Sequence, residues 1–111
     1  MNAVSVLREL ADQRGGNAIL VTPGVAELGL EHDRVHNRLG AYAEEHCDTI
    51  IAINPARIES FVNAIDPSKV AVETRATFAD ARRYVSEIST EKDVVLYEND
   101  LPDILEETRL L

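Results

Sequence analysis

The chain has 111 residues, enough for one hydrophobic core but too few for the two or three domains of most nucleotide-driven enzymes. It carries 20 acidic and 11 basic side chains, and the net charge of −9 disfavours binding to nucleic acid or to anionic membrane surfaces. We therefore expect one domain over residues 1–111, with no nucleic acid and no membrane as partner.

The single cysteine and the amino terminus indicate a cytoplasmic protein. Cys47 has no second cysteine to pair with, and its place between a helix and an apolar strand indicates a small buried side chain. The amino terminus lacks a basic region followed by an apolar run, and no stretch approaches the ~18 apolar residues of a membrane span.

The first two predicted elements are a helix and a strand. Residues 3–14 carry apolar side chains on one face and stop at Gly15-Gly16, which predicts an amphipathic helix with a glycine C-cap. Residues 17–21 form a continuous apolar run, which indicates a strand buried on both faces, as in a parallel sheet.

A second helix is predicted from near Glu31 to His46, and we expect Gly40 within it to permit close packing on the sheet. Residues 48–53 then read as a buried strand. Asn54 and Pro55 are typical of an N-cap and a first helical position, followed by an apolar stripe from 58 to 65.

The remainder of the chain repeats the alternation. We expect a strand at 69–73, a helix capped by Thr77, a strand at 93–97, a loop from 98 and a last helix with Pro102 in its first turn. The order αβαβαβαβα with short connections predicts an α/β fold with a mainly parallel sheet of about four strands.

The turn after the first strand is the predicted ligand edge. Open α/β sheets bind ligands at the carboxyl ends of their strands, and Thr22-Pro23-Gly24 ends a buried strand there. Glu27 lies among apolar neighbours, so we expect it to be partly buried. Its carboxylate either caps backbone N–H groups of its own loop or addresses a substrate amine or a basic residue of another domain.

His36 and a second loop add to this edge. His36 lies near the start of the second helix, where it either hydrogen-bonds the turn, faces a ligand or packs as a structural side chain. Asn99 and Asp100 follow the last strand, so they emerge at the same edge of a parallel sheet and are expected to converge with Glu27 and His36.

Two kinds of site are disfavoured. The sequence has no phosphate-binding loop of the G-x-x-x-x-G-K-[ST] type and no G-x-G-x-x-G fingerprint. His32 and His36 have the spacing of a zinc-binding pair, but the only other histidine, His46, lies more than two helical turns away. We therefore expect no metal site and keep a small metallohydrolase only as a minor alternative.

Several segments together resemble a known family. The run TPGVAELG at 22–29, the later His36 and CDTII at 47–51 resemble the C-terminal domain of the Mur ligases, which are ATP-dependent amide ligases of peptidoglycan synthesis. The closest likeness is to the enzyme that adds D-alanyl-D-alanine, whose domain also has a late D-V-V-L strand, here 93–96. In this chain TPG replaces the usual G-D-M, and the family's first strand and Asn-Pro motif would precede Met1.

The resemblance implies a Rossmann-like, three-layer domain that closes over a central ATPase domain and supplies part of an amino acid or dipeptide site. It implies substrate-binding roles, but no catalytic ones, for Thr22, Gly24, Glu27, His36, Asn99 and Asp100. ATP and Mg²⁺ would be bound mainly by the central domain, so the chain alone is expected to bind no cofactor and to be inactive.

Other readings of the chain stay open at this stage. The alternative function is a non-catalytic binding or interaction module with the same fold. From residue 91 onward there are seven acidic and two basic side chains, which form either a solvated face or a docking surface for a basic partner. The missing first strand would leave an edge or an apolar helix face bare, so self-association as a homo-oligomer is also expected.

Overall fold

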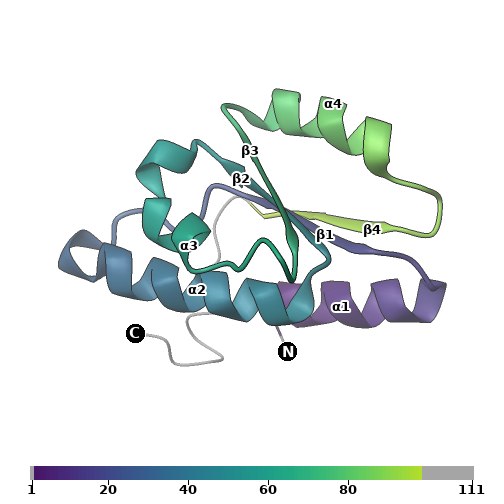
Figure 1. Cartoon of the computed structure of the whole chain (residues 1–111), viewed down its shortest axis with the longest axis horizontal. Coiled ribbons are helices and arrows are strands. Elements are labelled where there is room, and N and C mark those ends of the chain that lie inside the picture. The colour runs from purple at the N-terminus through teal and green to yellow at the C-terminus, as the bar shows by residue number, and fades with distance from the viewer. Residues whose placement is uncertain (1, 99–111) are drawn as a thin grey trace.

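The structure, a computed structural model, describes residues 2–98. Four α-helices, four strands and two short 3₁₀ segments alternate along this range (Figure 1). Their bounds are α1 Ala3–Arg14, β1 Ala18–Thr22, η1 Gly29–Glu31, α2 His32–His46, β2 Thr49–Ile53, η2 Pro55–Arg57, α3 Glu59–Asn63, β3 Ala71–Arg75, α4 Phe78–Ile88 and β4 Val94–Tyr97. The predicted last helix lies outside the described residues.

The four strands form one parallel sheet in the order β3-β2-β1-β4. Helices α1, α2 and α3 lie on one face of this sheet, and α4 covers the other (Figure 1). The chain therefore steps outward from β1 to β3 and then returns to the opposite side of β1. The predicted α/β fold is confirmed as a three-layer, Rossmann-like arrangement whose strand order reverses beside β1.

The two faces of the sheet have separate cores. On the helix-rich face, Leu20 and Ile50 pack with Leu39 and Phe61 in the larger cluster. On the other face, the strand residues Ile19, Val21, Ile51 and Ile53 meet Ala81 and Val85 of α4. All five residues of β1 are buried, which confirms that its apolar run is covered on both sides.

Short polar contacts fix the helix ends. Asn2 caps α1 by accepting a hydrogen bond from the Ser5 N–H, and Gly15 ends that helix at a φ of 71°. Thr77 caps α4 by accepting from the Asp80 N–H at 3.1 Å, as the sequence predicts. Cys47 is also buried as expected, and burial raises the pKa of its thiol to about 12.

The segment after β2 differs from the sequence prediction. Asn54 and Pro55 take the predicted N-cap and first positions, but of the 3₁₀ segment η2, and the Asn54 side chain makes no capping hydrogen bond. The Asn54 N–H donates to the Arg75 carbonyl oxygen at 2.8 Å, which extends the pairing of β2 with β3. Asn54 itself lies in the left-handed region at a φ of 54°. The predicted helix over 55–65 is accordingly split into η2 and a five-residue α3, and the strand predicted at 69–73 lies two residues later.

Gly40 permits a close contact with a helix rather than with the sheet. A Cβ atom at this position would lie 2.4 Å from the Phe61 carbonyl oxygen and 2.9 Å from the Ala64 Cβ. The expectation that Gly40 packs on the sheet is therefore wrong. The absent side chain instead lets α2 and α3 approach each other.

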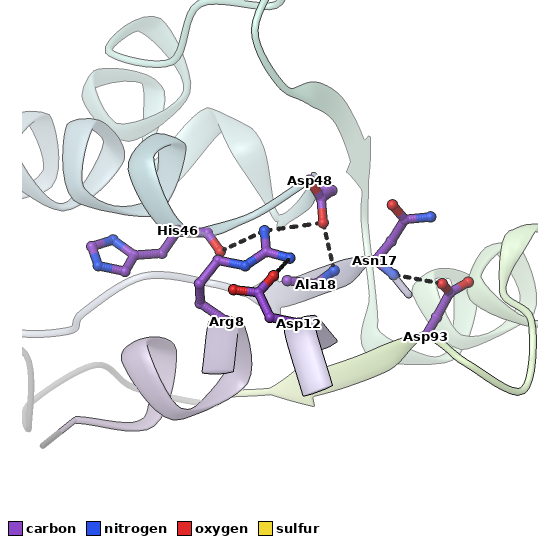
Figure 2. Close-up of polar contacts among 7 residues, drawn as sticks. All are labelled: Arg8, Asp12, Asn17, Ala18, His46, Asp48 and Asp93. Carbon is purple, nitrogen blue, oxygen red and sulfur yellow. Dashed lines mark hydrogen bonds and ion pairs between the residues drawn. The ribbon is translucent and has the colours of Figure 1, made fainter. Parts of the chain in front are cut away.

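Carboxylates fasten the amino ends of the strands, at the edge opposite the predicted ligand loop (Figure 2). Asp48 accepts from the Ala18 N–H at 2.8 Å and from the Arg8 guanidinium at 3.1 Å. Asp93 accepts from the Asn17 N–H at 2.7 Å, and the hydrogen bonds from Asn17 and Thr90 lower the pKa of its carboxyl. These contacts join β1 to both of its neighbours and have a structural role.

Within residues 2–98, every helix is too short or too polar to cross a bilayer.

Candidate functional site at the carboxyl edge

The loop from Pro23 to Leu28 leaves β1 at the carboxyl edge of the sheet and leads into η1 and α2 (Figure 1). β1 is the strand beside which the strand order reverses, because it pairs with β2 on one side and β4 on the other. In open α/β sheets this is the position where ligands bind. The fold thus places the predicted loop at the expected ligand edge.

Thr22 and Gly24 shape the first turn of this loop. The buried Thr22 hydroxyl accepts a hydrogen bond from the Gly24 N–H at 3.0 Å. Gly24 has a φ of 83°, which residues with a side chain rarely adopt. A Cβ on Gly24 would also lie 2.5 Å from His36 Nε2, so only glycine fits between the turn and the histidine.

His36 is fully buried and hydrogen-bonds the turn, which was one of its three predicted roles. Its Nε2 accepts from the Val25 N–H at 3.0 Å, and its Nδ1 donates to the His32 carbonyl oxygen at 2.8 Å. A ring that accepts at Nε2 must be neutral with its proton on Nδ1. Burial lowers the pKa of His36, which favours this neutral form.

Arg57 holds the same loop from the other side. Its guanidinium donates to the carbonyl oxygens of Pro23 and of Val25, the latter at 3.2 Å. Its own carbonyl oxygen accepts from His32 Nε2 at 2.8 Å, which ties η2 to the start of α2. Sequence reasoning missed Arg57, because it follows β2 and no local pattern links it to a loop more than 30 residues earlier.

Glu27 is exposed, so the expectation that it is partly buried is wrong. It stands at a φ of 60°, which is unusual for a residue with a side chain. Its carboxylate accepts no hydrogen bond and forms no ion pair with the residues that the structure describes, so the alternative of loop capping gains no support. The carboxylate is thus presented to the surroundings on a loop whose base is held by buried contacts.

Other groups at this edge frame the loop. Leu30 in η1 is fully exposed, at 103% of its reference area. On the α4 side, the Phe78 and Tyr97 rings lie 6.5 Å apart, and the Arg82 guanidinium lies 5.6 Å from the Tyr97 ring centre. An exposed apolar side chain is therefore present in η1, before α2, and aromatic and charged side chains lie on the α4 side.

The structure brings together four of the six residues predicted to bind substrate. Thr22, Gly24 and His36 form the base of the loop, and Glu27 lies at its surface. Asn99 and Asp100 lie outside the described residues, so their convergence with Glu27 stays a prediction. Of the four, Glu27 is the one whose side chain is free to meet a ligand.

Metal binding at the histidine pair has no support. The His32 and His36 rings lie 4.2 Å apart, but both of the His36 nitrogens and Nε2 of His32 are engaged with backbone groups. Residues 2–98 also gather no set of three His, Cys, Asp or Glu side chains that could hold a metal ion. At this edge the described residues offer a ligand the exposed Glu27 carboxylate.

Comparison with protein families, with curated proteins and with solved structures found no match to this chain.

Proposed function

We propose that the chain is the substrate-positioning, C-terminal-type domain of an ATP-dependent Mur-type amide ligase. The proposal is supported by the sequence resemblance and by one structural observation. This observation is that buried contacts of Thr22 and His36, together with half-buried contacts of Arg57, hold a loop that presents Glu27 where the strand order of a parallel sheet reverses. A loop held in this way gives a bound group a fixed position.

In this role the domain positions an attacking amine. The acyl phosphate forms on a central ATPase domain, and the loop edge holds the incoming amino acid or dipeptide against it while excluding water. The Glu27 carboxylate suits the ammonium group of that substrate before attack. This interaction is electrostatic, so Glu27 acts in binding and orientation and not as a nucleophile.

ATP and Mg²⁺ belong to the central domain in this proposal. The chain lacks a phosphate-binding loop, and its described residues form no metal-binding set. No step is therefore assigned to ATP or Mg²⁺ on this chain. Its own residues contribute the position of the amine and the closure of the site.

A second candidate function is a non-catalytic interaction module. The observation that favours it is the complete exposure of Leu30, three residues after Glu27, because contact with a partner protein would remove this apolar side chain from water. In that case the carboxyl edge would bind a protein surface and no amine substrate.

The test is to combine the purified chain with the N-terminal and central domains of a D-alanyl-D-alanine-adding Mur ligase from the same organism. We expect ADP release that depends on the chain, on the acceptor amine and on the acyl substrate together. Glu27→Gln should lower this rate by about tenfold, equivalent to about 1.4 kcal/mol.

Glu87→Gln is the matched control, because Glu87 is an exposed acid on α4, away from the loop. It should leave the rate unchanged. Tight binding of the chain to the other domains without amine-dependent ADP release would contradict the ligase role and favour the interaction module.

A further inference from the structure

An apolar groove runs between α1 and β4. It encloses about 330 Å³ and is lined by Val6, Leu7 and Leu10 of α1 and by Val94, Val95 and Leu96 of β4, with Asn2 and Ala3 near one end. Leu10 is 43% exposed there. Apolar surface of this kind costs free energy when it faces water.

The outer edge of β4 adjoins this groove and has no partner strand among residues 2–98. The N–H groups of Val94 and Glu98 donate inward, to the carbonyl oxygens of Asn17 and Val21. In a parallel ladder the alternate residues, Val95 and Tyr97, therefore direct their N–H and C=O groups outward. An exposed strand edge beside an apolar groove invites another segment to cover it.

The net charge of −9 disfavours a second copy of this chain as the covering segment, because the two copies would repel each other. The continuation of β4 is better placed. Glu98 remains attached to β1 through its N–H, and the sequence continues for 13 more residues.

The direction of α1 also suits this continuation. A short glycine turn joins α1 to β1, so α1 runs antiparallel to the strands and begins near their carboxyl ends (Figure 1). The chain thus leaves β4 at the end of the groove where α1 starts.

The sequence after Glu98 has the pattern that the groove requires. Leu101, Ile104 and Leu105 have the three- and four-residue spacing typical of one helical face, and Leu111 falls on the same face two turns after Ile104, whereas Leu110 does not. Eleven helical residues would span roughly 16 Å, and the part of α1 that lines the groove spans roughly 12 Å. The acidic residues Asp103, Glu106 and Glu107 fall between the apolar positions.

We propose that residues 101–111 pack along the α1–β4 groove with these apolar side chains inward, and so close the β4 side of the sheet to other chains. This inference does not depend on the proposed ligase role. It assigns the groove to a segment of the same chain and leaves the carboxyl edge as the surface for partners.

Paramagnetic broadening tests this placement. A nitroxide attached at Glu107→Cys should remove most of the methyl signal intensity of Val6, Leu10 and Val94. Cys47 will not take up the label, since it is buried and its thiol pKa is raised to about 12. A label at Ser86→Cys, exposed on the opposite face of the sheet, should leave these signals sharp.

Two comparisons make the result decisive. Replacing Ile104 and Leu105 by Asp in the labelled protein should restore the methyl signals, whereas the matched change Glu106→Ala should not. Unbroadened signals in the singly labelled monomer would overturn the proposal. It would also fail if broadening appeared only between labelled and isotope-enriched copies in a mixed sample, because the occupant would then be a second copy.

Discussion

His36 shows how a single residue supports the candidate site without facing a ligand. Its two ring nitrogens join the Val25 N–H to the His32 carbonyl oxygen, so the ring fixes the loop relative to α2. Glu27 has the complementary position, since it is exposed and adopts an unusual backbone conformation on the loop that His36 holds. The stability of the loop and its chemistry are therefore carried by different residues.

At the residue scale we predict that protonation of His36 destabilises the fold. Burial holds its folded-state pKa below 6.5, so the unfolded state binds more protons under mildly acidic conditions. The stability contributed by neutral His36 is fully present above pH 6.5 and declines as the pH falls below that value. Urea unfolding of the wild-type chain at pH 7.5 and pH 5.0 should show this loss.

Two variants separate His36 from the carboxylates that also titrate in acid. His36→Gln keeps an acceptor for the Val25 N–H but does not titrate, so it should lose less stability between the two pH values. His36→Ala should cost about 2–4 kcal/mol at pH 7.5, because it leaves a cavity and an unpaired buried N–H. Equal pH dependence in wild type and His36→Gln would show that this histidine is not the titrating group.

At the element scale, the contact between α2 and α3 depends on one missing side chain. Gly40 faces the backbone of Phe61, and backbone cannot move aside as the end of a flexible side chain can. α3 is also only five residues long and has no side-chain cap, so it depends on packing for its helical form.

We predict that Gly40→Ala destabilises the protein by about 1–3 kcal/mol, although alanine is the better helix former. The added methyl group would overlap the Phe61 carbonyl oxygen and force α3 away from α2. Asn37→Ala, at an exposed position of the same helix, should change stability by less than about 0.5 kcal/mol. Thermal melts of both variants measure the difference, and a stabilised Gly40→Ala protein would show that α3 adjusts without cost.

At the scale of the whole molecule, charge opposes compaction. A net charge of −9 on 111 residues produces repulsion that the folded state concentrates and the unfolded chain relieves. The ion pairs within residues 2–98 are mostly local and exposed, such as Arg34 with Glu31 and Arg83 with Asp80, and they offset little of it.

We predict that added salt stabilises the protein, by about 1 kcal/mol between low and high ionic strength, because it screens this repulsion. Urea unfolding at several sodium chloride concentrations provides the measurement, with potassium chloride as a check that the ion identity is unimportant. Replacing Glu9 and Glu45 by Gln, both exposed acids, should reduce the gain. Destabilisation by salt would mean that attractive pairs outweigh the repulsion.

Prediction from the sequence worked where short-range physics decides the outcome. The apolar run of β1, the glycine after α1 and the threonine before α4 each have one favoured structure, and each adopts it. It succeeded only in part after β2, where Asn54 and Pro55 begin a 3₁₀ segment in the predicted positions, but the Asn54 side chain makes no capping hydrogen bond and its N–H donates to Arg75, from a strand about 20 residues away. The sequence also could not show what Gly40 contacts, because its contact with Phe61 depends on how α2 and α3 pack together.

The sequence by itself determined the alternation of helices and strands, the parallel sheet and the place of the loop at its carboxyl edge, because hydrophobic periodicity and turn residues act over a few positions. Only the tertiary structure decided which side chains support that loop and which one is exposed. Arg57 reaches the loop from beyond the next strand, His36 is enclosed by the packing of α2, and Glu27 is left outside. Burial and long-range hydrogen bonds depend on the positions of all the elements together, and no local pattern carries that information.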